Sequence, residues 1–148
     1  MSTSTPAPIS PAPTAAVARL RNAAAIASLI VVVQLVLAVI MLSGNGSRAI
    51  AESHGGLGYL FTIVSAVAAY FAWQATRTGS KGLFFHAVSV PVLAVIQIIL
   101  AAVDLRWVHV ALGVALVAAI IALFALAARA TGAPRPADPS GESQSARP

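Results

Sequence analysis

The sequence predicts an all-α integral membrane protein: a four-helix bundle of two tandem helical hairpins that form a parallel internal repeat. Three observations predict it. First, 59% of the 148 residues are hydrophobic and only 9% are charged, with a mean hydropathy of +0.90, which excludes a soluble globular domain. Second, four stretches lack charge for about 20 residues, enough helix to cross a hydrocarbon core of about 30 Å. Third, a pattern of Gln, His and Gly recurs in both halves of the chain.

The four charge-free stretches define the predicted membrane spans. They cover residues 23–42, 57–76, 82–103 and 108–128, within a transmembrane domain of residues 19–130. The flanking segments, residues 1–18 and 131–148, are rich in Pro, Ser and Ala and predict disordered tails. We therefore expect any chemistry to lie within the bundle or at its rims.

The first and third spans each carry one glutamine. Gln34 opens Gln-Leu-Val-Leu-Ala, and Gln97 opens Gln-Ile-Ile-Leu-Ala. Because an amide in hydrocarbon needs a hydrogen-bond partner, both side chains should face the bundle interior. Their expected partner is either a neighbouring helix or the substituents of a bound ring.

The second and fourth spans each open with His-x-x-Leu-Gly. His54 precedes Gly58 and His109 precedes Gly113 by four residues, so each glycine shares a helix face with its histidine. A glycine there lets a flat ring lie against the backbone. Close packing of two helices is the alternative explanation of the glycines.

Basic residues predict the orientation, because Lys and Arg near span ends stay in the cytoplasm. Seven of them flank the same side of the predicted bundle: Arg19, Arg21, Arg77, Lys81, Arg129, Arg135 and Arg147. The two other connections are neutral, since Arg48 is matched by Glu52 and Arg106 by Asp104. Eight arginines against one lysine indicate a GC-rich bacterial genome. We expect a multi-pass protein of a bacterial plasma membrane with both termini cytoplasmic. Its net charge of +5 then reflects contact with anionic lipid rather than binding of nucleic acid.

This orientation puts His54 and His109 at the outer ends of the second and fourth spans. Helices two and four lie diagonally in an up-and-down bundle, about 12–14 Å apart, which suits a haem iron held between two imidazoles. Two alternatives remain. Rim histidines can be amphipathic, with the ring at headgroup level. Copper or zinc could be bound by the two histidines together with Glu52 and Asp104.

His86 has no counterpart in the other half, so it predicts no second haem site. Pro91 removes a backbone N–H and frees a carbonyl near Ala87, which His86 or Ser89 is expected to bond. The sequence contains no nucleophile beside a base, no carboxylate pair and no phosphate-binding glycine loop, so it does not predict an enzyme.

The Gln-x-x-Leu-Ala helix, the His-x-x-Leu-Gly-Tyr segment from His54 and the histidine of the fourth span resemble an uncharacterised family of small four-span bacterial membrane proteins. The layout of residues 19–129 is also similar to one four-helix half of haem A synthase. That resemblance implies that His54 and His109 are axial haem ligands. The chain has one such half rather than two, lacks the synthase's cysteines, and has Glu52 two rather than three residues before the histidine. The resemblance therefore implies haem binding rather than haem modification.

The predicted function is the binding of one b-type-like haem for electron transfer, haem handling or redox sensing. The alternative is a cofactor-free membrane subunit or transport accessory that packs against a membrane-protein partner or a second copy of the chain. A third reading, an enzyme acting on lipid or quinone, lacks visible catalytic residues.

Overall fold

The computed structural model describes residues 15–77 and 81–132, and every regular element in these ranges is an α-helix. The helices are α1 (Ala15–Leu42), α2 (Arg48–Thr76), α3 (Lys81–Ala102) and α4 (Arg106–Gly132). Each is long and apolar enough to cross a membrane. The predicted all-α bundle of four membrane-spanning helices is confirmed.

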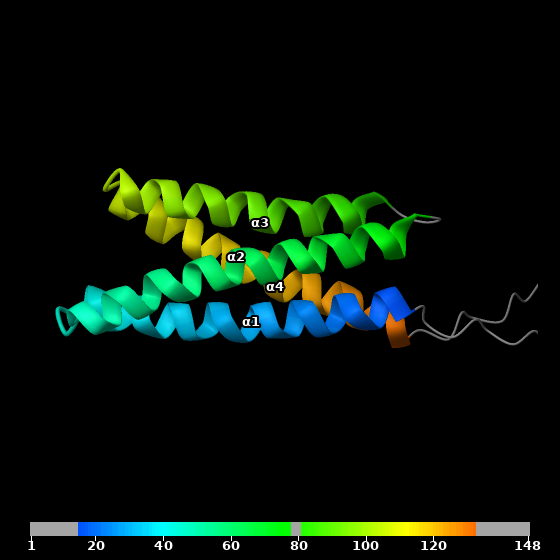
Figure 1. Cartoon of the computed structure of the whole chain (residues 1–148), viewed down its shortest axis with the longest axis horizontal. Coiled ribbons are helices and arrows are strands. Elements are labelled where there is room, and N and C mark those ends of the chain that lie inside the picture. The colour runs from blue at the N-terminus through cyan, green and yellow to red at the C-terminus, as the bar shows by residue number, and fades with distance from the viewer. Residues whose placement is uncertain (1–14, 78–80, 133–148) are drawn as a thin grey trace, which may run out of the picture.

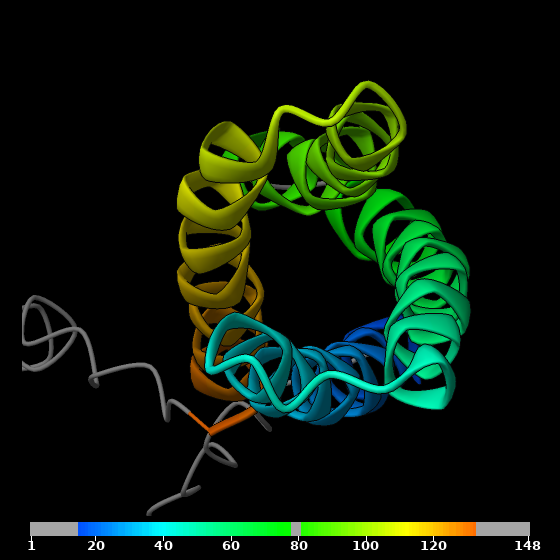
Figure 2. The same ribbon diagram turned by 90° about the vertical axis from the view of Figure 1, so that its left-hand side faces the viewer.

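The four helices form a closed ring. Each packs against its neighbours in the chain, and α1 also packs against α4 (Figure 1). The pairs α1–α3 and α2–α4 make no such contact and lie diagonally, as the end-on view in Figure 2 shows. The start of α1 and the end of α4 lie at one end of the bundle, called here the terminal end. The connections α1–α2 and α3–α4 lie at the other, called the histidine end.

The helices extend beyond the predicted charge-free spans. The first begins at Ala15 and the second at Arg48, so both include arginines that the span boundaries left outside. Charge is excluded from hydrocarbon but not from a helix, which can continue into the headgroup layer. Residues 15–18 and 131–132 are helical, contrary to their assignment to disordered tails. The rest of both predicted tails lies outside the described residues.

The same turn closes both hairpins at the histidine end. Gly44, with φ of 82°, follows α1, and Asp104, with φ of 57°, follows α3. In each turn the next residue's N–H bonds back across the helix end: Asn45 to the Ile40 carbonyl at 3.2 Å, and Leu105 to the Leu100 carbonyl at 3.0 Å. This is the Schellman pattern, in which one left-handed residue terminates a helix.

The buried core is concentrated toward the terminal end and is built largely from alanine. Its small residues let the four helices approach closely. They are Ala23, Ala24, Ala27, Ala68, Ala69, Ala72, Ala87, Ala94 and Ala127. Toward the histidine end buried side chains become few, and the helices enclose a cavity instead.

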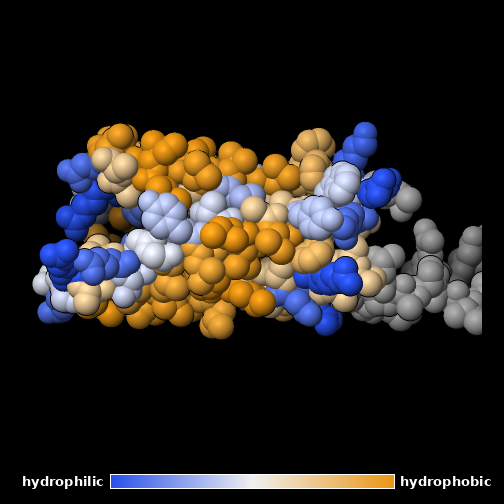
Figure 3. Space-filling model, in the orientation of Figure 1, coloured by the Kyte–Doolittle hydropathy of each residue, from blue (hydrophilic) through white to orange (hydrophobic). Residues whose placement is uncertain are grey.

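On the face that Figure 3 shows, the surface between the two ends is largely apolar, with a band of residues of intermediate hydropathy along it, and the two ends are polar. Large side chains such as Leu29, Ile63 and Val92 are more than half exposed there. Trp73, near the terminal end, and Trp107, near the histidine end, are also exposed, each with an arginine side chain over its ring. Apolar flanks with tryptophans toward both ends are the pattern of a protein surrounded by lipid.

Candidate functional site

A cavity of about 450 Å³ lies between all four helices in the half of the bundle toward the histidine end. Its floor consists of one buried side chain from each helix: Val31, Phe61, Ala94 and Leu116. The volume falls in the range of small-molecule and cofactor sites, about 300–1,000 Å³. The Ala-rich core below the floor separates the cavity from the terminal end.

The residues lining the cavity occupy matching positions in the two hairpins. Around the glutamines they are Val31, Leu35, Ala38 and Val39 in α1, and Ala94, Ile98, Ala101 and Ala102 at the same spacings in α3. After the histidines they are Gly55, Gly58, Tyr59 and Phe61 in α2, and Val110, Gly113, Val114 and Leu116 at the same spacings in α4. Only Leu42 and Val117 lack a partner among these lining positions.

All six residues predicted as a site line this one cavity. They are Gln34, His54, Gly58, Gln97, His109 and Gly113. They come from four different helices, so the fold brings together residues that are far apart in sequence.

The two imidazoles face each other across the diagonal. Their ring centroids are 6.2 Å apart and the ring planes meet at 63°. With a metal–nitrogen bond of about 2.0–2.1 Å and the ligating nitrogen about 1.1 Å from its ring centre, two axial imidazoles place their ring centres about 6.3 Å apart. The spacing of His54 and His109 therefore fits a shared metal.

The hydrogen bond made by His109 fixes its tautomer. Its Nδ1–H donates to the backbone carbonyl of Gln97 at 3.0 Å. A carbonyl only accepts, so the proton is on Nδ1 and the lone pair is on Nε2. A metal-binding histidine is typically oriented in this way, with its second nitrogen bonded to a carbonyl or carboxylate.

His54 has a related but incomplete arrangement. The main chain of Gln34 interacts with its ring, as that of Gln97 does with His109. However, Nδ1 of His54 is buried and meets no hydrogen-bond partner among the described residues. His54 therefore lacks the hydrogen bond that orients His109.

Each glutamine amide occupies the space above a glycine. A Cβ built on Gly58 would lie 3.2 Å from Nε2 of Gln34, and one on Gly113 would lie 2.8 Å from Nε2 of Gln97. Both Oε1 atoms are buried without a hydrogen-bond partner in the described part of the chain. A buried unsatisfied amide oxygen costs about 1–3 kcal/mol, so a ligand with a donor group would find two acceptors here.

The carboxylates of the alternative copper or zinc site do not join the histidines. Glu52 is exposed and accepts a 2.7 Å hydrogen bond from Arg48, and Asp104 is exposed in its turn. Among residues 15–77 and 81–132, no three His, Cys, Asp or Glu side chains are grouped as metal ligands. The cavity therefore offers two imidazoles, and any metal bound between them would need its remaining ligands from another group.

His86 and Ser89 do not bond the carbonyl freed by Pro91, contrary to prediction. His86 Nε2–H donates to the Ala119 carbonyl of α4 at 2.9 Å, and Ser89 donates to the His86 carbonyl at 2.8 Å. The imidazole is long enough to reach a neighbouring helix, whereas the hydroxyl bonds one turn back within its own helix.

Several lining residues were not predicted, including Val31, Ala38, Ala94 and Ala101. The only signal for them is helical spacing, since each lies three residues before or four after a glutamine and so shares its face.

Comparison of the chain with models of known protein families, with curated proteins and with solved structures gave no match.

Proposed function

We propose that this chain is a bacterial plasma-membrane protein that binds one b-type haem in the cavity, with His54 and His109 as axial ligands. The observation that carries the proposal is the 6.2 Å spacing of the two imidazoles across the diagonal of the bundle. The cavity around them supports it, because its volume of about 450 Å³ lies in the range of cofactor sites and most of its lining side chains are apolar.

A bound haem would supply one-electron chemistry at a potential set by its ligands and surroundings. The residues of this chain have distinct roles toward it. His109, held by the Gln97 carbonyl, presents Nε2, and His54 completes the pair. The Gln34 and Gln97 amides lie over Gly58 and Gly113, and their NH2 groups would donate hydrogen bonds to the carboxylate substituents of a haem.

The proposed orientation has both termini in the cytoplasm. Five described cations, Arg19, Arg21, Arg77, Lys81 and Arg129, lie toward the terminal end. The two described carboxylates, Glu52 and Asp104, lie toward the histidine end. The cation excess favours a cytoplasmic terminal end, which would put the haem near the outer face. The matching cavity positions support the proposed internal repeat of two hairpins.

The test is an oxidised-minus-reduced visible spectrum of protein purified in detergent after expression with a haem precursor. Wild type should show a low-spin α-band. Both His54→Ala and His109→Ala should lose that band, because either ligand alone leaves the iron without its second imidazole.

His86→Ala is the matched control, since His86 bonds the Ala119 carbonyl and does not line the cavity. It should keep the band. A colourless wild type, or a band that survives both cavity variants, would refute haem binding. The cofactor-free membrane subunit would then be the better description.

A further inference from the structure

A second hollow lies outside the haem cavity, in the groove between α1 and α2 toward the terminal end. It has a volume of about 330 Å³ and is lined mainly by apolar side chains: Ala23, Ile26, Val64, Val67 and Phe71. Arg19 and Asn22 are the two polar residues at its edge. None of the proposed haem-site residues lines it, so the proposed function does not account for it.

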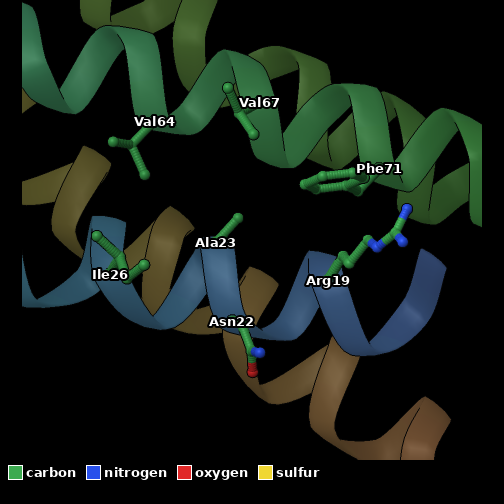
Figure 4. Close-up of a pocket in the computed structure, with 7 residues that line it drawn as sticks. All are labelled: Arg19, Asn22, Ala23, Ile26, Val64, Val67 and Phe71. Carbon is green, nitrogen blue, oxygen red and sulfur yellow. The ribbon is translucent and has the colours of Figure 1, made fainter. Parts of the chain in front are cut away.

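The groove has a charged end and an apolar end. Figure 4 shows Arg19 reaching from α1 toward Phe71 of α2, while Ile26 and Val64 lie at the opposite end. Asn22 is on the rim, with its side chain directed away from α2. From residue 19 to residue 26 the helix rises about 10 Å, which is the length of about eight methylene groups.

The Arg19 guanidinium has no carboxylate to pair with. No described residue bonds to its side chain, and both described carboxylates lie at the other end of the bundle. Four further cations lie toward the same end: Arg21, Arg77, Lys81 and Arg129. The local charge therefore favours an anion at the mouth of the groove.

We propose that this groove binds one anionic phospholipid, with its phosphate at Arg19 and an acyl chain along Phe71, Val67 and Val64. A guanidinium donates charge-assisted hydrogen bonds to phosphate oxygens. Basic pockets between transmembrane helices are known binding sites for anionic lipid headgroups. The groove floor at Ala23 is small enough to seat the chain against the helix.

The test is native mass spectrometry of the full chain in uncharged detergent, titrated with phosphatidylglycerol or with phosphatidylcholine of the same acyl chains. Wild type should bind phosphatidylglycerol with a several-fold preference. Arg19→Gln should reduce that preference about fivefold, the effect of one basic residue beside an anionic lipid. Arg21→Gln, an exposed arginine on the same helix that does not line the groove, should retain it.

Filling the groove should exclude both lipids. Val67→Trp places an indole over the middle of the groove, whereas Ile63→Trp changes an exposed residue one turn away that does not line it. The proposal fails if the two lipids bind alike, if Arg21→Gln acts as strongly as Arg19→Gln, or if Val67→Trp binds lipid as wild type does. The two arginine variants change exposed side chains, so that pair alone decides if Val67→Trp does not fold. The His54→Ala protein should keep the preference, so loss of haem binding is distinguishable from loss of the lipid site.

Discussion

Each histidine of the candidate site is accompanied by a glycine and a glutamine, and Gly113 has the least room for an added methyl group. A methyl group on Gly113 would come within 2.8 Å of the Gln97 amide nitrogen, whereas one on Gly55 would meet nothing within 4 Å. The two glycines therefore respond differently to alanine. Alanine favours a helix by about 1 kcal/mol over glycine, so Gly55→Ala should be neutral or stabilising.

Gly113→Ala should be less stable than Gly55→Ala by about 1 kcal/mol, because the Gln97 amide must move to admit the methyl group. Removing the amide with Gln97→Ala should relieve this cost. Unfolding of the haem-free single and double variants in mixed micelles measures the coupling free energy. Strictly additive effects of the two substitutions would mean that the two residues do not compete for one space.

The two buried amide oxygens make a separate prediction. Gln97→Met and Gln34→Met keep the side-chain volume but remove an acceptor that has no partner. Each should raise the free energy of unfolding of the haem-free protein by about 1 kcal/mol. Gln74→Met, which changes a partly exposed amide near the end of α2 that does not line the cavity, is the control and should have little effect. A loss of stability in the cavity variants would indicate that water or another group bonds these oxygens.

The residues of the site were predictable from the sequence, but the contacts between their atoms were not. Gln34, His54 and their equivalents were predicted because polar residues in an apolar chain are rare and recur in one order. Which atoms meet was not predictable, because it depends on how far each helix is rotated about its axis. The bond from His109 to the Gln97 carbonyl is an example: sequence identifies both residues but not the main-chain acceptor.

Two side-chain hydrogen bonds cross between α3 and α4: His109 donates to the Gln97 carbonyl at the cavity, and His86 donates to the Ala119 carbonyl nearer the terminal end. Ser89 bonds only within α3. His86→Leu should lower the free energy of unfolding by about 0.5–1.5 kcal/mol, since it removes a bond in an apolar surrounding. Ser89→Ala should cost less, because its partner carbonyl lies on the same helix.

Denaturation of these two variants tests the seam between α3 and α4. An equal loss for both would mean that the interhelical bond contributes nothing beyond a local one.

The number and approximate position of the helices were predictable from charge-free length alone. Their ends were not, since the Schellman turns at Gly44 and Asp104 and the helical start at Ala15 depend on local backbone geometry.

The two ends of the molecule differ in how closely the helices pack and in the charge that they carry. The Ala-rich half toward the terminal end is closely packed and bears the groove with Arg19, while the other half contains the cavity with His54 and His109. The diagonal placement of α2 and α4 was predicted from an up-and-down bundle and is confirmed. The cavity itself was not predictable in size, because it arises from the balance of small and large side chains on four helices at once.

The orientation of the bundle in the membrane is the last prediction. The sequence contains no cysteine, so single cysteines can be introduced without background. Asn45→Cys lies in the exposed α1–α2 turn at the histidine end, and Ala15→Cys lies at the exposed start of α1. If the cation-rich terminal end is cytoplasmic, a membrane-impermeant maleimide should label Asn45→Cys in intact cells and Ala15→Cys only after lysis. The reverse pattern would place the histidine end inside and make a cytoplasmic redox partner the one to seek.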